Sequence, residues 1–293
     1  MDEYAIGVLT NVGLLSFVAA SAYLLLICGE LSFGQQAFFG AGAYAAGIAT
    51  AMLGWALPFG MLAAVVAGAL AALLVGLATL RLHGLYFAMA TLAAAEMMRI
   101  LLELFHWQVK VAGERVGPDG TQGFRGIRWI FERGIEPLGF LALVWLMLAC
   151  VIAIFLWIER SRLGATLRAL GEDPELARAL GVNVERLKLA AVAASGALAA
   201  LGGALFAHHN TYIEPRNFDI MLGVHSLAYP LIGGLGTVLG PLLGVAIDIG
   251  LLEGTRFFQG YRMIVFGGLV AVLLIFRPRG LLDERLMHSL RRR

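Results

Sequence analysis

Long runs of apolar residues, separated by short polar stretches, cover most of this 293-residue chain. A membrane-spanning helix needs about 20 consecutive, mostly apolar residues. Six runs meet that length, at 4–27, 31–53, 57–80, 85–105, 137–158 and 189–207. A further apolar segment, 222–253, is broken by glycines and by Gly240 and Pro241, so we expect two short helices that meet at a turn. A last, short span is expected at 262–276.

The pattern therefore predicts an all-α membrane protein, a polytopic transmembrane helix bundle of about eight spans, some of them broken or re-entrant. Several spans carry a small residue at every fourth position, which places these residues on one helix face and lets neighbouring backbones approach closely. The stripes are Gly60, Ala64, Gly68, Ala72 and Gly76; Ala37, Ala41, Ala45 and Ala49; and Ala191, Ser195, Ala199, Gly203 and Ala207. They favour a compact bundle, in a single transmembrane domain that covers 1–293.

The positions of Lys and Arg predict the side of the membrane that each loop faces. Cytoplasmic loops carry an excess of these residues, and 159–188 and the C-terminal tail 277–293 hold six each. We therefore expect both in the cytoplasm and the loops 106–136 and 208–219 outside. The side of the N-terminus stays open, because it depends on whether 31–53 crosses the membrane or re-enters.

Composition supports this class of protein and excludes others. Hydrophobic residues make up 60% of the chain and charged residues 14%, against about 45–50% and about 25% in soluble domains. The net charge is +2, and no basic groove suggests a nucleic-acid partner.

The loop 159–188 contains a short helix with its own start and stop signals. Asp173 is suited to cap the helix, and Pro174 fits the first helical position. Glu175 in the first turn suits the helix dipole, and Gly181 is a good terminator.

Three apolar residues of this helix, Leu176, Ala177 and Leu180, share one face. A helix of about two turns is not stable alone in water, so this face needs a partner. The partner is either another protein or the chain's own bundle, and the pattern alone does not choose between them.

Glu175, Leu176 and Ala177, followed after three residues by Gly181, resemble the Glu-Ala-Ala…Gly loop of ABC importer permeases, with Leu176 as a departure. That loop forms the coupling helix, which docks in a groove of the ATPase subunit. The wider sequence resembles the branched-chain amino-acid permease family. The segments that carry this resemblance are 31–44, 161–173, 179–183, 233–241 and 276–282.

The resemblance implies a permease subunit that moves branched-chain amino acids across the bacterial cytoplasmic membrane by alternating access. It implies three kinds of protein partner: a second homologous permease, two ATP-binding-cassette ATPase subunits and a periplasmic or extracellular substrate-binding protein. It assigns ATPase coupling to Asp173, Pro174, Glu175, Leu176, Ala177, Leu180 and Gly181. The same architecture also suits urea, a short amide or another small amino acid, and the sequence does not choose among these substrates.

No site for ATP or for covalent chemistry is found. The chain has no phosphate-binding loop, since neither lysine, Lys110 or Lys188, follows a glycine. Any ATP hydrolysis is thus expected in a separate subunit, and no catalytic residue, metal or cofactor is predicted. His208 and His209 are expected to be exposed polar residues, because a metal site needs more ligands.

Polar residues inside the spans are candidates for function. Glu96, Arg99 and Glu103 are helical neighbours, so we expect a structural ion pair. Glycine-rich, broken spans are where transporters place cavities. We therefore predict that the translocation path is lined by Ser32, Gln35, Gln36, Phe39, Tyr44 and His225.

Two other classes of protein remain as alternatives. A stand-alone secondary transporter or channel would need relaying acids in the spans, and Glu96 and Glu253 leave that open, although the capped loop argues against it. An intramembrane enzyme would need a nucleophile and a base, or metal ligands, and the sequence offers no such set.

Overall fold

The computed structural model describes residues 2–79, 81–111, 114–254, 262–277 and 280–282. The predicted tail, 277–293, falls largely outside the described residues. Within them, five helices are long and apolar enough to cross a membrane. These are α1 (Glu3–Ile27), α3 (Leu57–Thr79), α4 (Leu85–Leu104), α6 (Pro137–Arg160) and α9 (Val184–Asn210).

Shorter helices complete the bundle. The apolar ones are α2 (Gln35–Gly47), continued by the π-helical turn η1 (Ile48–Met52), and α10 (Ile220–Gly233), α11 (Leu239–Gly254) and α12 (Arg262–Phe276). Three others lie at the ends of the bundle: α5 (Trp129–Glu132), α7 (Arg162–Glu172) and α8 (Pro174–Ala179). The chain is an all-α polytopic membrane protein.

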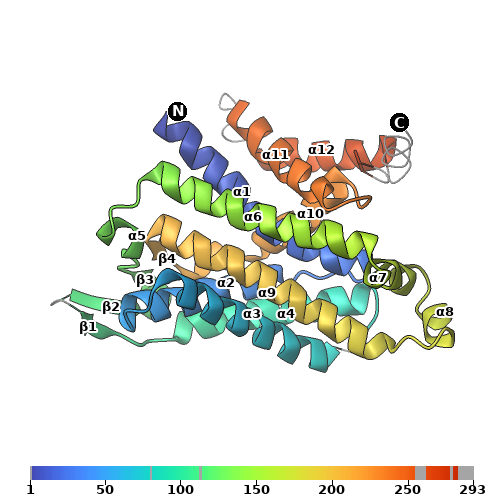
Figure 1. Cartoon of the computed structure of the whole chain (residues 1–293), viewed down its shortest axis with the longest axis horizontal. Helices are drawn as coiled ribbons and strands as arrows, with labels where there is room; N and C mark the ends of the chain where they lie inside the picture. The colour runs from blue at the N-terminus through green and yellow to red at the C-terminus, as the bar shows by residue number, and fades with distance from the viewer. Residues whose placement is uncertain (1, 80, 112–113, 255–261, 278–279, 283–293) are drawn as a thin grey trace.

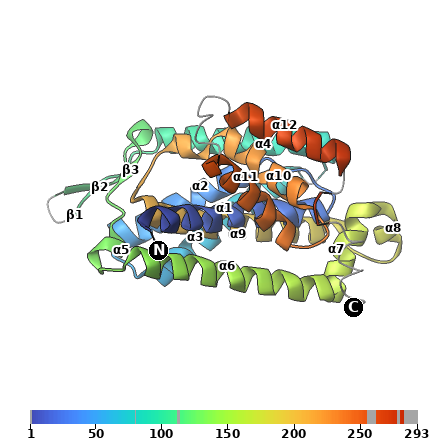
Figure 2. The ribbon, with the colours of Figure 1, turned by 90° about the horizontal axis from the view of Figure 1, so that it is seen from above.

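The bundle has a centre made of α1, α2 and α9 and an outer layer. In their most apolar stretches, α1 is 72% buried and α9 is 56% buried, whereas α3, α4 and α6 are only 22–28% buried. Figure 2 shows α6 along one side and α4 along the other, with α1 and α9 between them. The apolar outer faces of α3, α4 and α6 suit contact with lipid, which carries no penalty for apolar side chains.

Glycines allow the central helices to pack backbone against backbone. A Cβ added at Gly42 of α2 would overlap the backbone of Ala200 in α9, and one added at Gly203 would overlap the carbonyl oxygen of Phe39. On α3, a Cβ added at Gly68 would lie 2.6 Å from the carbonyl oxygen of Gly196 in α9. The predicted small-residue stripes on α3 and α9 are therefore confirmed as helix-packing surfaces.

The two ends of the bundle differ in structure (Figure 1). One end carries a small antiparallel sheet, ordered β1-β2-β3-β4. Its strands are β1 (Val109–Val111), β2 (Glu114–Pro118), β3 (Phe124–Arg125) and β4 (Tyr212–Ile213). We call it the sheet end. The opposite end carries α7, α8 and the turn 81–84, and we call it the α8 end.

The sheet joins two loops that are far apart in the sequence. Phe124 of β3 pairs with Ile213 of β4, so 106–136 and 208–219 form one unit at the same end. The sequence predicted these loops on one side but gave no sign of strands, because each is only two to five residues long.

Two predicted helix boundaries are corrected. The run 31–53 does not begin as helix: α1 ends before Gly29, which has φ +77°, and α2 starts only at Gln35. The intervening segment is mostly buried within the bundle, where non-helical backbone is tolerated. The run 189–207 is longer than predicted, since Asn183 caps α9 by accepting from the backbone N–H of Arg186 at 3.0 Å.

The break within 222–253 is confirmed. Helices α10 and α11 are separated by the turn 234–238, which begins at Gly234 with φ +102°. A side chain at this φ would be strained, so glycine determines where α10 ends.

Candidate functional site

The capped helix predicted in 159–188 is present as α8 at the α8 end. One oxygen of Asp173 accepts from the backbone N–H groups of Glu175 and Leu176, both at 3.0 Å. Pro174 opens the helix, and Gly181 follows it with φ +85°. These caps let a six-residue helix hold its shape between α7 and α9.

The apolar residues of α8 and of its C-cap, Leu180, do not form one exposed face. Ala177 is 1% exposed and packs in the main hydrophobic core, whereas Leu176 is 58% exposed and Leu180 75% exposed. Ala177 therefore anchors the helix to its own bundle. The two leucines remain available to a partner.

Beside α8 lies an open cavity of about 680 Å³. Its walls come from the end of α3, the turn after it, α8 and the start of α9. It contains Arg81, His83, Arg178 and Glu185, and Arg178 is also paired with Glu175 at 2.6 Å. The two exposed leucines thus lie beside a cavity lined by charged side chains. Apolar residues next to polar ones are suited to contact with a protein partner.

The predicted path residues Ser32 and Gln35 lie in a buried hydrogen-bond chain. The Ser32 hydroxyl donates to the side-chain amide oxygen of Gln35, and the Gln35 amide nitrogen donates to the hydroxyl of Ser195, each at 3.1 Å. Ser195 then donates to the carbonyl oxygen of Ser21 at 2.9 Å. These hydrogen bonds connect the start of α2 to α9 and α1. The sequence showed Ser195 only as a member of a small-residue stripe.

The side chain of Gln36, the next residue, has quite different surroundings. It is 1% exposed, yet neither its amide nitrogen nor its amide oxygen has a hydrogen-bond partner in the described part of the chain. The amide lies against Gly223 of α10, where an added Cβ would overlap it. A buried amide without partners is costly, so its presence calls for a functional explanation.

Towards the sheet end, α2 contributes to an aromatic cluster. Phe218, which follows β4, lies 6.0 Å from Phe39, 6.2 Å from Tyr44 and 6.2 Å from Phe206, between ring centroids. The Tyr44 hydroxyl is buried and has no hydrogen-bond partner among the described residues. The cluster packs α2 and α9 against the loop that contains Phe218.

The six predicted path residues are thus only partly brought together. Five lie on or just before α2, in the core of the bundle. His225 lies on α10, two residues from the glycine that touches Gln36, and its ring is 5.9 Å from that of Tyr229. Sequence patterns missed Phe218 and Gly223, because neither has a signal that distinguishes it from ordinary packing.

The predicted ion pair in α4 is confirmed. The Nε of Arg99 donates to Glu96 at 2.8 Å, and Arg99 also pairs with Glu103. All three side chains are partly exposed at 20–34%, and each acid has a basic partner. This arrangement fits a structural role.

The expectation that both histidines are exposed is wrong for His208, while His209 is half-buried. Helix α9 continues through both, so His208 is fully buried, within 3.0 Å of the Thr50 hydroxyl and 2.7 Å of the Ala204 carbonyl oxygen. His209 stacks on Phe140 at 5.6 Å, beside a cavity of about 260 Å³.

Comparison with known proteins identifies the family. Residues 4–276 match the family described as "Branched-chain amino acid transport system / permease component". The chain is similar to the high-affinity branched-chain amino acid transport system permease protein LivM of Escherichia coli K12, at 31% identity over 281 residues. It is also similar to LivH of the same organism, at 28% over 147 residues, and to BraD of Pseudomonas aeruginosa, at 30% over 137 residues.

These matches cover the relatives incompletely. The LivM match spans 87% of this chain and 64% of LivM, the LivH match 49% and 47%, and the BraD match 46% and 44%. No solved structure matches the chain. Because the family match extends over nearly the whole sequence, the chain belongs to the family of permease components of branched-chain amino acid transport systems.

Proposed function

We propose that the chain is the transmembrane permease subunit of an ABC importer that moves branched-chain, or other hydrophobic, amino acids across the bacterial cytoplasmic membrane. The observation that carries the proposal is α8, a capped helix with two exposed leucines, in a chain that belongs to this transport family. ATP hydrolysis takes place in two separate ATPase subunits, and this chain performs no covalent chemistry.

Each end of the bundle has its own partner in this proposal. The α8 end faces the cytoplasm, together with the C-terminus, and Leu176 and Leu180 enter a groove of the ATPase. The sheet end faces outward and receives a substrate-binding protein on the unit formed by 106–136 and 208–219. A second, homologous permease completes the pore.

The proposed substrate suits the chemistry along α2. An amino acid with a branched apolar side chain has an apolar part that can pack on Phe39 and Phe218. Its polar end needs hydrogen bonds, and the Gln36 amide, which has no partner among the described residues, can make them when α2 and α10 separate. Urea, short amides and other small amino acids are the alternative substrates, and competition with radiolabelled leucine uptake distinguishes them.

The docking role of α8 is tested by capture of the ATPase. The chain is purified in detergent with a candidate ABC-type ATPase from the same organism, as wild type and as the double variant Leu176→Glu/Leu180→Glu. Charges on the two exposed leucines are expected to lower ATPase capture at least tenfold, because they place carboxylates in an apolar contact.

Leu163→Glu is the matched control, since Leu163 is 54% exposed in the neighbouring helix α7. It should retain the ATPase. Equal capture by the double variant would place the docking surface elsewhere. Uptake by the wild-type chain without any ATPase would refute the importer proposal and favour a secondary transporter.

A further inference from the structure

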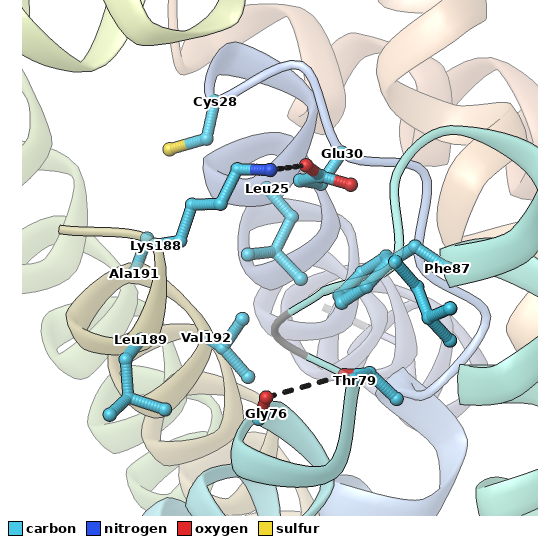
Figure 3. Close-up of a pocket in the computed structure, with 11 residues that line it drawn as sticks. Leu25, Cys28, Glu30, Gly76, Thr79, Phe87, Lys188, Leu189, Ala191 and Val192 are labelled. Atoms are coloured by element: carbon cyan, nitrogen blue, oxygen red, sulfur yellow. Dashed lines mark hydrogen bonds and ion pairs between the residues drawn. The ribbon is translucent and has the colours of Figure 1, made fainter. Parts of the chain in front are cut away.

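A buried ion pair joins two segments that lie far apart in the sequence. Lys188, in the first turns of α9, reaches across to Glu30, on the segment that follows α1 (Figure 3). The Lys188 side chain is 8% exposed and that of Glu30 6% exposed. The cavity between them and the nearby apolar residues is only about 10 Å³.

Packing alone does not require these charges. Moving two charges out of water carries a desolvation penalty that often exceeds their attraction, and apolar residues of similar volume often serve stability equally well. In addition, the second carboxylate oxygen of Glu30 is buried without a hydrogen-bond partner in the described structure. The pair therefore points to a role in fixing the relative position of two elements.

One of these elements leads directly to α8. Lys188 lies nine residues beyond the end of α8, with only the short linker 180–183 before α9 begins. On the other flank, Gly171 near the end of α7 touches Gly29: a Cβ added at Gly29 would lie 2.8 Å from the Gly171 carbonyl oxygen. The helices before and after α8, α7 and α9, therefore both contact the segment that follows α1: α7 at Gly29 and α9 at Glu30.

The other element leads directly to α2. Two residues after Glu30, the hydroxyl of Ser32 accepts from the backbone N–H of Gly34 at 3.1 Å and donates to Gln35. Gln35 is the first residue of α2, and Gln36 follows it. A displacement of Glu30 therefore reaches the helix that carries the candidate path through a short, hydrogen-bonded segment.

We propose that the Glu30–Lys188 ion pair is the contact through which movement of α8 displaces α2. Glu30 and Lys188 are positioning residues: neither meets the substrate or ATP. When the ATPase moves α8, Lys188 carries Glu30 with it, and the start of α2 follows. This inference rests on the proposed function, because it presupposes that an ATPase moves α8.

The test measures how tightly substrate transport is coupled to ATP hydrolysis. The assembled complex of both permeases, ATPases and binding protein is reconstituted in liposomes, and substrate transported per ATP hydrolysed is determined. The main variant is Glu30→Gln/Lys188→Met, which removes both charges and leaves no unpaired ion. We expect it to assemble and hydrolyse ATP as the wild type does, with transport per ATP lowered at least fivefold.

Arg160→Gln is the control, since it removes an exposed basic side chain from the last turn of α6, and it should keep the wild-type ratio. A wild-type ratio in the neutral double variant would overturn the proposal. If that variant does not assemble, Glu30→Asp replaces it, because it keeps both charges and withdraws the carboxylate by one methylene. A lowered ratio supports the proposal there, and an unchanged one overturns it.

The two proposals fail in different ways. If the wild-type chain retains no ATPase, the importer function fails, and this inference fails with it. If the ATPase binds and hydrolyses ATP but the ratio does not depend on Glu30 and Lys188, the importer function stands and the ion pair is only structural.

Discussion

Two consecutive glutamines in the core of the bundle have opposite surroundings. Gln35 is 0% exposed and both its amide atoms are hydrogen-bonded, whereas Gln36 is 1% exposed and its amide has no partner in the described structure. An unsatisfied buried polar group costs about 1–3 kcal/mol. The same substitution at the two positions should therefore have opposite effects on stability.

We predict that Gln36→Leu raises the stability of the purified chain by about 1–2 kcal/mol, while Gln35→Leu lowers it by a similar amount because Ser32 and Ser195 lose their partner. Thermal unfolding in detergent measures both. If Gln36 meets the substrate, Gln36→Leu also reduces uptake despite its greater stability. Equal destabilisation by both variants would show that the Gln36 amide is satisfied in the protein.

Single residues were predictable where the cause is local. Asp173 and Gly181 were identified as caps because a cap acts on residues within one turn. His208 was misplaced because its partner, Thr50, lies 158 residues away. The Lys188–Glu30 pair spans the same separation and gave no signal in the sequence.

Between helices, the tightest contacts are made by glycine. We predict that Gly203→Ala destabilises the chain by at least about 2 kcal/mol, since overpacking costs about 1–3 kcal/mol and the obstacle is the rigid backbone of Phe39. Thermal unfolding in detergent measures this change.

Gly7→Ala in α1 is the matched control, because an added Cβ there would meet no atom within 4 Å. It should be neutral or slightly stabilising, as alanine favours helix. A neutral Gly203→Ala would mean that α2 and α9 are not in backbone contact.

Helices were predictable from apolar length, but their irregular parts were not. The π-helical turn η1 and the non-helical residues 31–34 before α2 both lie inside the apolar run 31–53. Apolar length reports burial in lipid or protein, and a segment held by the neighbouring helices needs no helical hydrogen bonds of its own. The strands could not be predicted either, because each is too short to display an alternation of apolar and polar residues.

For the whole molecule, the two ends should lie on opposite sides of the membrane. We predict that a cysteine at Lys110, in β1 at the sheet end, reacts with a membrane-impermeant maleimide in intact spheroplasts. A cysteine at Leu180, which is 75% exposed at the α8 end, should react only after permeabilisation.

The background for this labelling is Cys150→Ala, since Cys150 is exposed and Cys28 is buried. The reverse pattern would invert the proposed orientation, and labelling of both cysteines in intact spheroplasts would contradict a fully spanning bundle. The overall class and the joint placement of 106–136 and 208–219 followed from apolar length and charge. The sheet that unites these loops required the three-dimensional structure.

The burial of α1 has a consequence for biogenesis. This helix is synthesised long before its partner α9: Ser195 donates to the carbonyl oxygen of Ser21 across 174 residues. Thr10, Ser16 and Ser21 each donate to a carbonyl oxygen of α1 itself, at 2.6–2.7 Å. Helix α1 can therefore remain in the lipid with these hydroxyls satisfied, until the later helices leave the translocon and enclose it.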